Sequence, residues 1–120
     1  MDINAADVKE YINVELALPR VLGNKALYKQ MLTLFLESAE FDAFEDALAA
    51  GDNAEAGAKI HGIKGISGSL SMTALFETSS LLNEQLKVGP ADPGILAEYR
   101  VAYVKTREYA EQMVASSALG

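Results

Sequence analysis

The amino-acid sequence predicts an all-α protein, an antiparallel four-helix bundle with short helical decoration at its N-terminal end. Apolar residues recur at helical spacing along nearly the whole chain, and no stretch alternates apolar and polar residues as a half-buried strand would. Glycine, proline and cap residues divide the chain into segments of helical length. The links between these segments are short, which places consecutive helices side by side in opposite directions.

Length and composition limit the number of domains, the partners and the location that we expect for the protein. With 120 residues, 50% of them hydrophobic, the chain can bury one core, so residues 1–120 are expected to form a single domain. The net charge of -7 argues against nucleic acid or an anionic membrane as the main partner. Cysteine is absent, which excludes disulfides and thiolate chemistry. Because the sequence contains no apolar run of membrane-spanning length and no signal pattern, we expect a cytoplasmic protein, and we expect it to be a monomer.

Residues 1–23 are expected to form one or two short helices that lie against the others. Asn4 is a candidate cap, and Pro19 ends or restarts a helix. The apolar residues at helical spacing in this segment are Val8, Ile12 and Leu16.

A long helix is expected to follow, opened by the break at Gly23 and the cap at Asn24 and running to about Ala50. Small residues near Ser38 allow a bend in it. Its inner face is expected to consist of Leu27, Met31, Leu34 or Phe35, Phe41, Phe44 and Leu48.

Two helices are expected in the C-terminal part of the chain. Thr73 is predicted to cap the first, which ends at about Val88, before glycine and proline. Asp92 and Pro93 are predicted to cap and open the second, and residues 115–120 are expected to fray. The inner residues of the first are Leu75, Leu82 and Leu86, and those of the second are Ile95, Tyr99, Ala102 or Tyr103, Thr106, Tyr109 and Met113.

The segment between Ala54 and Leu70 carries the one histidine of the chain, His61, together with four glycines. Asp52 or Asn53 is expected to cap it as a helix. Glycine inside a helix costs about 1 kcal/mol relative to alanine, so a helix here forgoes roughly 4 kcal/mol. Its core side is predicted to contain Ala56, Ile63 and Leu70, with Ile60, Ile66 and Ser67 on the flanks.

At about 100° per residue, the opposite side of this helix carries His61 with small residues around it. Lys64 follows one turn later and can reach the same space. Three glycines fall within roughly 40° of His61, and two alanines share their face. These small residues are Gly57, Gly65, Gly68, Ala54 and Ala58. The sequence therefore predicts an exposed imidazole beside one mobile cation. The surrounding helix surface carries only small residues, so a large and rather flat partner can approach it.

The chemistry open to His61 is limited by its neighbours along the helix. Glu55 points to a different side, and a lone imidazole is a poor metal site. Ser67 and Ser69 lie about 120° and 80° around the helix from His61, so no serine–histidine dyad is built locally. Phosphoryl transfer to a neutral ring nitrogen fits better, because Lys64 can screen the new charge and the small residues leave room for a donor.

The plainer interpretation is that His61 is only a surface residue and that the glycines mark close helix packing. A second alternative is a helical-bundle adaptor that binds a signalling partner through the same face without being phosphorylated. An enzyme is disfavoured, since the sequence contains no nucleotide-binding loop and no second catalytic group.

Two blocks of residues resemble histidine-containing phosphotransfer domains. The first consists of His61, Ile63, Lys64, Gly65, Ser67 and Leu70. The second is similar to the start of the first long helix in bacterial members and consists of Leu22, Gly23, Asn24, Leu27, Tyr28, Met31, Leu32 and Phe35. Asp52 also matches, and the resemblance runs from about Val14 to Lys87. Two departures are Ser71, where many members carry glycine, and the small Gly62 directly after the histidine.

The resemblance implies a phosphorelay intermediate without a catalytic site of its own. His61 would accept a phosphoryl group from the aspartate of a response-regulator receiver domain, or of a hybrid sensor kinase, and pass it to another receiver. Lys64 would steady the phosphate, and Gly65 would clear the approach. The chain itself would need no cofactor, since the receiver would supply Mg²⁺. Partner contacts are expected at Gly57, Ala58, Gly65 and Gly68.

Overall fold

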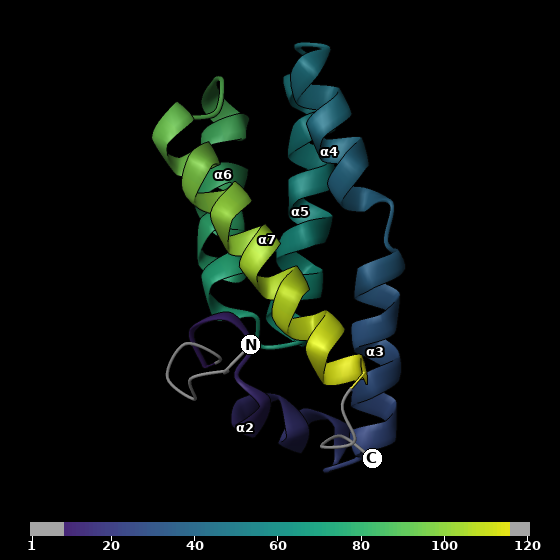
Figure 1. Cartoon of the computed structure of the whole chain (residues 1–120). Helices are drawn as coiled ribbons and strands as arrows, with labels where there is room; N and C mark the ends of the chain where they lie inside the picture. Colours follow the sequence, from purple (N-terminus) through teal and green to yellow (C-terminus); the bar gives the residue numbers. More distant parts are fainter. Residues whose placement is uncertain (1–8, 116–120) are drawn as a thin grey trace.

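The computed structural model describes residues 9–115, and within this range the chain is all-helical, with no strand (Figure 1). The fold class predicted from the sequence is thus confirmed at the level of an all-α protein. Residues 9–11 are helical, and Asn4, Val8 and residues 116–120 lie outside the described range. The elements are α2 (Val14–Ala17), the 3-10 helix η1 (Leu18–Val21), α3 (Lys25–Glu37), α4 (Glu40–Ala49), α5 (Asn53–Ser69), α6 (Thr73–Val88) and α7 (Pro93–Ala115).

Helix α5 is central to the arrangement. It packs against α6 on one side and α4 on the other, while α7 runs beside α6 and reaches α3 at its far end (Figure 1). The short segments α2 and η1 lie across the end of the molecule where α5 turns into α6. The molecule is elongated, 43 × 24 × 21 Å. None of the helices among the described residues combines the length and apolarity needed to cross a membrane.

The prediction of one helix from Asn24 to Ala50 was wrong, because the chain breaks at Ser38 into α3 and α4. Ser38 has extended backbone angles, φ -66° and ψ 133°, and its Oγ accepts a hydrogen bond from the Glu40 N–H at 3.2 Å. A serine hydroxyl that binds a nearby N–H competes with the helical bonding pattern. The predicted bend thus became a complete interruption.

The predicted inner face of α3 was wrong at Leu27, whereas of the two alternatives Leu34 and Phe35 it is Phe35 that is buried. Leu27 and Leu34 are 41% and 67% exposed, whereas Tyr28 and Leu32 are buried beside Phe35. The buried Tyr28 hydroxyl donates a hydrogen bond to the Leu70 carbonyl at 2.9 Å. This bond ties α3 to the end of α5, on the side of α3 where Leu32 and Phe35 are also buried.

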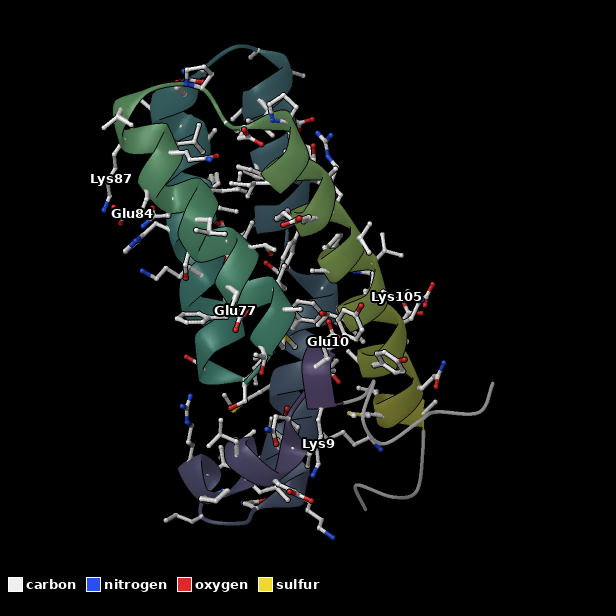
Figure 2. The ribbon with its side chains drawn as sticks, turned by 90° about the vertical axis from the view of Figure 1, so that its left-hand side faces the viewer. Lys9, Glu10, Glu77, Glu84, Lys87 and Lys105 are labelled. Atoms are coloured by element: carbon white, nitrogen blue, oxygen red, sulfur yellow. The ribbon has the colours of Figure 1, made fainter. Side chains whose placement is uncertain are left out.

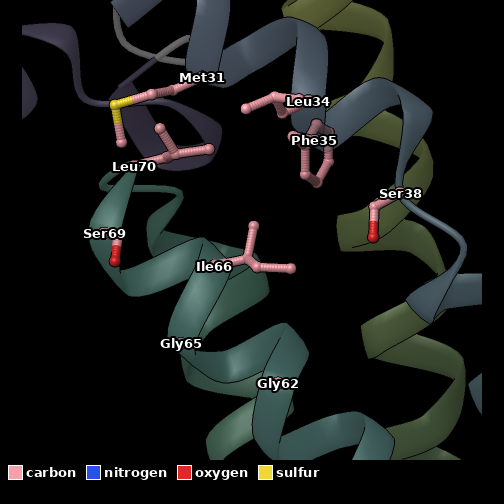
Figure 3. Close-up of a pocket in the computed structure, with 9 residues that line it drawn as sticks. All are labelled: Met31, Leu34, Phe35, Ser38, Gly62, Gly65, Ile66, Ser69 and Leu70. Atoms are coloured by element: carbon pink, nitrogen blue, oxygen red, sulfur yellow. The ribbon is translucent and has the colours of Figure 1, made fainter.

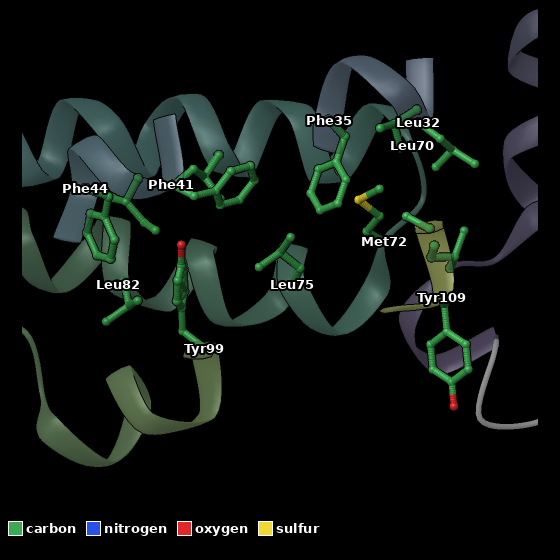
Figure 4. Close-up of a cluster of buried hydrophobic side chains, with 14 of the residues drawn as sticks. Leu32, Phe35, Phe41, Phe44, Leu70, Met72, Leu75, Leu82, Tyr99 and Tyr109 are labelled. Atoms are coloured by element: carbon green, nitrogen blue, oxygen red, sulfur yellow. The ribbon is translucent and has the colours of Figure 1, made fainter. Parts of the chain in front are cut away.

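The core runs the length of the helices and is rich in aromatic rings (Figure 4). Phe41 of α4 stacks on Tyr103 of α7 with ring centroids 4.4 Å apart, and Phe44 contacts Tyr99 at 5.2 Å. The predicted inner residues of α6 are buried. Those of α7 are buried or half-buried. A salt bridge between Arg100 and Glu45 adds a further link between α7 and α4.

Helix ends follow the sequence signals in most places. The Asp52 carboxylate caps α5 by accepting the Glu55 N–H at 3.0 Å. The Asp92 carboxylate accepts the N–H groups at the start of α7. Thr73 was wrongly predicted as a cap, because the N-cap of α6 is Met72 and no side chain caps this helix. Met72 is fully buried, so packing rather than capping decides the residue at this position.

Candidate functional site around His61

His61 is exposed on α5, and the opposite side of the helix is buried. The buried residues of this helix are Ala56, Ile60, Ile63 and Ser67. The helix is continuous through all its glycines, so the predicted orientation of His61 away from the core is found. The core packing of these four residues fixes the rotation of α5 and thereby keeps the imidazole outside.

His61 and Lys64 line the same hollow, which has a volume of about 600 Å³. Lys64 is half-buried, and no ion pair among residues 9–115 includes it. The pKa of the Glu84 carboxyl is lowered, first by its hydrogen bond to Lys87 and by that residue's charge, and to a smaller extent by Lys64 (Figure 2). Lys64 therefore adds a positive charge to the hollow that His61 lines.

Within residues 9–115, no metal-binding cluster accompanies His61, and the Ser67 hydroxyl is not directed at the ring. The Ser67 hydroxyl is buried and donates to the Ile63 carbonyl at 2.8 Å, so it is turned away from the imidazole. Among the described residues, no group of three or more histidine, cysteine or acidic side chains is placed to hold a metal ion. What remains is an accessible imidazole nitrogen with a cation beside it.

The glycines of α5 have different surroundings. A Cβ on Gly65 would meet no atom within 4 Å, so this position is open. A Cβ on Gly57 would lie 3.7 Å from the Leu86 Cβ, and one on Gly68 would lie 3.2 Å from the Phe76 ring. Gly57 and Gly68 therefore lie where α5 packs against α6. Of the three glycines, only Gly65 leaves the exposed surface of α5 open to a partner. Ala58 is exposed.

A Cβ on Gly62 would approach the Glu40 carboxylate to 3.2 Å. Because Glu40 stands at the start of α4, the small residue directly after the histidine lets α4 approach α5 closely. Gly62 does not interrupt the helix.

A second hollow, of about 470 Å³, lies between α3 and α5 and is mainly apolar (Figure 3). Its apolar wall is made by Met31, Leu34, Phe35, Ile66 and Leu70. Gly62 and Gly65 form its floor on α5, and Gly65 borders both hollows. The exposed side of α5 therefore has the apolar hollow on the side of α3. On its other side is the hollow around His61, which contains Lys64 and Arg20.

Sequence reasoning did not find Arg20, which η1 brings to the hollow around His61. Its Nη1 donates a hydrogen bond to the Gly68 carbonyl at 2.6 Å. Leu16 and Phe76, 53% and 38% exposed, line the same hollow. These side chains come from segments far from His61 in the sequence, and no local spacing relates them to it.

Among residues 9–115, no acidic side chain lines the hollow around His61. It is lined by Leu16, Arg20, His61, Lys64, Gly65, Ser67, Gly68, Ser69, Ser71, Met72, Thr73 and Phe76. The chain as a whole has 17 acidic and 10 basic residues, so this surface differs in sign from the average of the molecule. A negatively charged group approaching His61 meets Lys64, and a second cation, Arg20, lies farther along the same hollow at Gly68. No carboxylate is found among the described residues that line this hollow.

Ser71 links α5 to α6 in a left-handed conformation, with φ 55°. Its N–H donates to the Gly68 carbonyl, and the next N–H, that of Met72, donates to the Ser67 carbonyl. This pair of bonds defines a Schellman turn, in which the left-handed position favours glycine. The Ser71 hydroxyl is buried and has no hydrogen-bond partner.

Comparison of the chain with protein-family models, with curated proteins and with solved structures finds no match. Any assignment of function therefore depends on the residues and geometry of the site itself.

Proposed function

We propose that the protein is a histidine phosphotransfer protein of a two-component phosphorelay. The observation that carries this proposal is the exposed His61 with Lys64 one turn later and an open Gly65, in a hollow that no acidic side chain of the described residues lines. On this interpretation α5, α6, α7 and the broken pair α3 and α4 form the antiparallel four-helix bundle of that class.

The proposed reaction is an in-line phosphoryl exchange. A nitrogen of the neutral His61 ring attacks the phosphorus of an aspartyl phosphate on a receiver domain. The nitrogen–phosphorus bond forms as the bond between phosphorus and the aspartate oxygen breaks, and the aspartate leaves as a carboxylate. The other ring nitrogen keeps its proton throughout. Lys64 offsets the negative charge brought onto this face, and the reverse reaction delivers the group to a second receiver.

The open Gly65 and the absence of nearby carboxylates in the hollow each favour this exchange. The donor must bring its aspartyl phosphate to within bonding distance of the ring, so bulk near His61 would block it. Carboxylates in the hollow would repel the phosphoryl group. The receiver is the element that would contribute Mg²⁺ and the acidic pocket, and this chain would act as a carrier rather than an enzyme. A monomer in the cytoplasm is part of the same proposal.

The test is phosphoryl transfer from a labelled receiver. Wild-type protein should acquire an acid-labile, alkali-stable label, and His61→Gln should acquire none while keeping its helical circular dichroism. Gly65→Gln should slow the transfer at least tenfold, since its side chain occupies the open ground next to the ring. Label on His61→Gln, or none on the wild type with any receiver tested, contradicts the proposal.

The apolar hollow between α3 and α5 favours one alternative, an adaptor that binds a signalling partner without phosphorylation. The same variants separate the two functions. An adaptor would keep its partner and its activity after His61→Gln and lose both after Gly65→Gln, whereas a phosphoryl carrier loses activity in both cases.

A further inference from the structure

Arg20 is the second cation of the hollow around His61, and no carboxylate among residues 9–115 forms an ion pair with it. Its one hydrogen bond within residues 9–115 is the bond from Nη1 to the Gly68 carbonyl, at 2.6 Å. A guanidinium carries five N–H donors, so most of them remain available. None of the ion pairs in this part of the chain includes Arg20, and the residue is exposed.

Arg20 is placed too far along α5 to serve a phosphoryl group on His61. Gly68 follows His61 by seven residues, which corresponds to about 10 Å along a helix axis. Helical side chains also lean toward the N-terminal end, so the imidazole leans away from Gly68. Lys64 lies much closer to the ring along the helix. An anionic group that binds Arg20 must therefore belong to a partner molecule that docks over the hollow.

The surroundings of Arg20 favour a second, separate anion. The N-terminus of α6 has no side-chain cap, and Ser71, Met72 and Thr73 at this end line the hollow. A helix N-terminus carries free N–H groups and a partial positive charge. Next to this end, the Ser71 hydroxyl is buried and has no hydrogen-bond partner among the described residues.

We propose that Arg20 and the N-terminus of α6 form a carboxylate-binding subsite that selects the docking protein. The occupant is an acidic side chain of a receiver domain, flanked by apolar side chains that cover Leu16 and Phe76. An arginine and a carboxylate can pair through two parallel hydrogen bonds, which makes the contact directional. The identity of the partner as a receiver domain depends on the proposed function. The new element is that Arg20 makes the affinity differ between receivers.

The test compares the binding of unphosphorylated receivers to the wild type, Arg20→Ala, Arg20→Lys and Arg20→Glu by calorimetry. Arg20→Ala should raise the Kd of the cognate receiver roughly tenfold or more, as expected for loss of a charge-assisted hydrogen bond. Arg20→Lys should recover part of the loss. Arg20→Glu should bind least, and replacing the facing acidic residue of the receiver by lysine should restore its binding.

The control is Lys105→Ala, which removes one positive charge from α7 (Figure 2). No residue of α7 lines the hollow, so this variant should bind receivers within twofold of the wild type. Thermal melts of all variants check that η1 stays docked, because Arg20 also holds the Gly68 carbonyl. An Arg20→Ala protein that binds like Lys105→Ala would overturn the proposal, as would a charge swap that fails to rescue Arg20→Glu.

The two proposals fail separately. If the wild type takes up label from a receiver but Arg20 variants bind normally, the subsite is wrong and phosphotransfer stands. If receivers bind in an Arg20-dependent way but never label His61, phosphotransfer is wrong and the subsite stands. If no receiver binds the wild type, the proposal that a receiver domain occupies the Arg20 subsite is wrong.

Discussion

Ser71 and Gly51 occupy the same left-handed position in two turns of the same kind. Gly51 follows α4 with φ 70°, and Ser71 follows α5 with φ 55°. At Gly51 the following N–H also donates back across the turn, from Asp52 to the Ala47 carbonyl at 3.0 Å. Glycine adopts this conformation without strain, whereas a residue with a Cβ loses roughly 1 kcal/mol. The turn after α5 therefore holds strain that the turn after α4 avoids.

The first prediction follows from this pair. Ser71→Gly should raise the free energy of unfolding by about 1 kcal/mol, because it removes the strain and the unpartnered buried hydroxyl together. The reciprocal control, Gly51→Ser, should lower it by a similar amount. Urea unfolding followed by circular dichroism measures both. A Ser71→Gly protein that is less stable would show that the hydroxyl stabilises the fold.

At the scale of the element, α5 combines a buried apolar side with an exposed side built of small residues. Its glycines reduce helix propensity, so part of its stability must come from the packing of Ile60 and Ile63 and from the cap at Asp52. Asp52 and Glu55 also place negative charge at the positive end of the helix. The helix that carries His61 thus tolerates an open surface because its ends and its core side are well fixed.

The second prediction concerns Gly65. Gly65→Ala should raise the free energy of unfolding by up to about 1 kcal/mol, since the added methyl meets no atom and improves helix propensity. It should also slow phosphoryl transfer, since the methyl protrudes beside His61. Gly57→Ala is the matched control: its methyl fits at 3.7 Å from Leu86 and should stabilise without slowing transfer. Equal transfer rates for the two variants would show that the missing side chain at Gly65 is not needed for the partner to approach His61.

The third prediction tests the cap of α5. Asp52→Ala removes the acceptor of the Glu55 N–H and should lower the free energy of unfolding by about 1 kcal/mol. Asp52→Asn keeps an oxygen acceptor and should lose only part of this. Thermal melts of the two variants measure the difference. Equal losses would assign the effect to the charge of Asp52 rather than to its hydrogen bond.

At the scale of the whole molecule, two buried tyrosines make the fold sensitive to alkaline pH. Burial raises the pKa of Tyr28 and of Tyr99 well above the ordinary value, and the negative charge of Glu45 adds to the effect at Tyr99. Both side chains are 1% exposed. The folded state therefore keeps these hydroxyls protonated at a pH where the unfolded chain releases their protons.

The fourth prediction is the direction and slope of this effect. The stabilisation is fully present below the unfolded tyrosine pKa of about 10 and is lost as the pH rises above it. Each tyrosine should contribute a slope of up to about 1.4 kcal/mol per pH unit. Tyr99→Phe should reduce the slope by the share of one tyrosine. Urea titrations at several alkaline pH values measure this, and an unchanged slope in Tyr99→Phe would contradict it.

The sequence alone predicted the helical class, the extents of α5, α6 and α7, the cap at Asp92 and, as one of two candidates, the cap at Asp52. These features depend on spacing and on residues a few positions apart. It failed at α3, where adjacent apolar residues such as Leu27 and Tyr28 define two equally good stripes. The tertiary packing of α3 decides between them, since Tyr28, Leu32 and Phe35 are buried and the Tyr28 hydroxyl bonds to the Leu70 carbonyl, 42 residues away.

The candidate site divides in the same way. The outward direction of His61 follows from the apolar spacing of α5 alone, because rotation about a helix axis is set by which side is buried. The roles of the glycines do not follow from it: Gly57 and Gly68 face α6, and Gly65 faces solvent. Phosphotransfer, with its receivers, stays a prediction that the labelling experiment decides.

The sequence by itself therefore determined that the chain is helical, where α5, α6 and α7 lie, and which side of α5 carries the imidazole, since local spacing and capping control these features. The tertiary structure decided what surrounds that imidazole. It brought Arg20 from η1 to the end of α5, 48 residues away in the chain, and opened an apolar hollow against α3. Such neighbours depend on how helices pack and where the chain breaks, and no local pattern of residues records that packing.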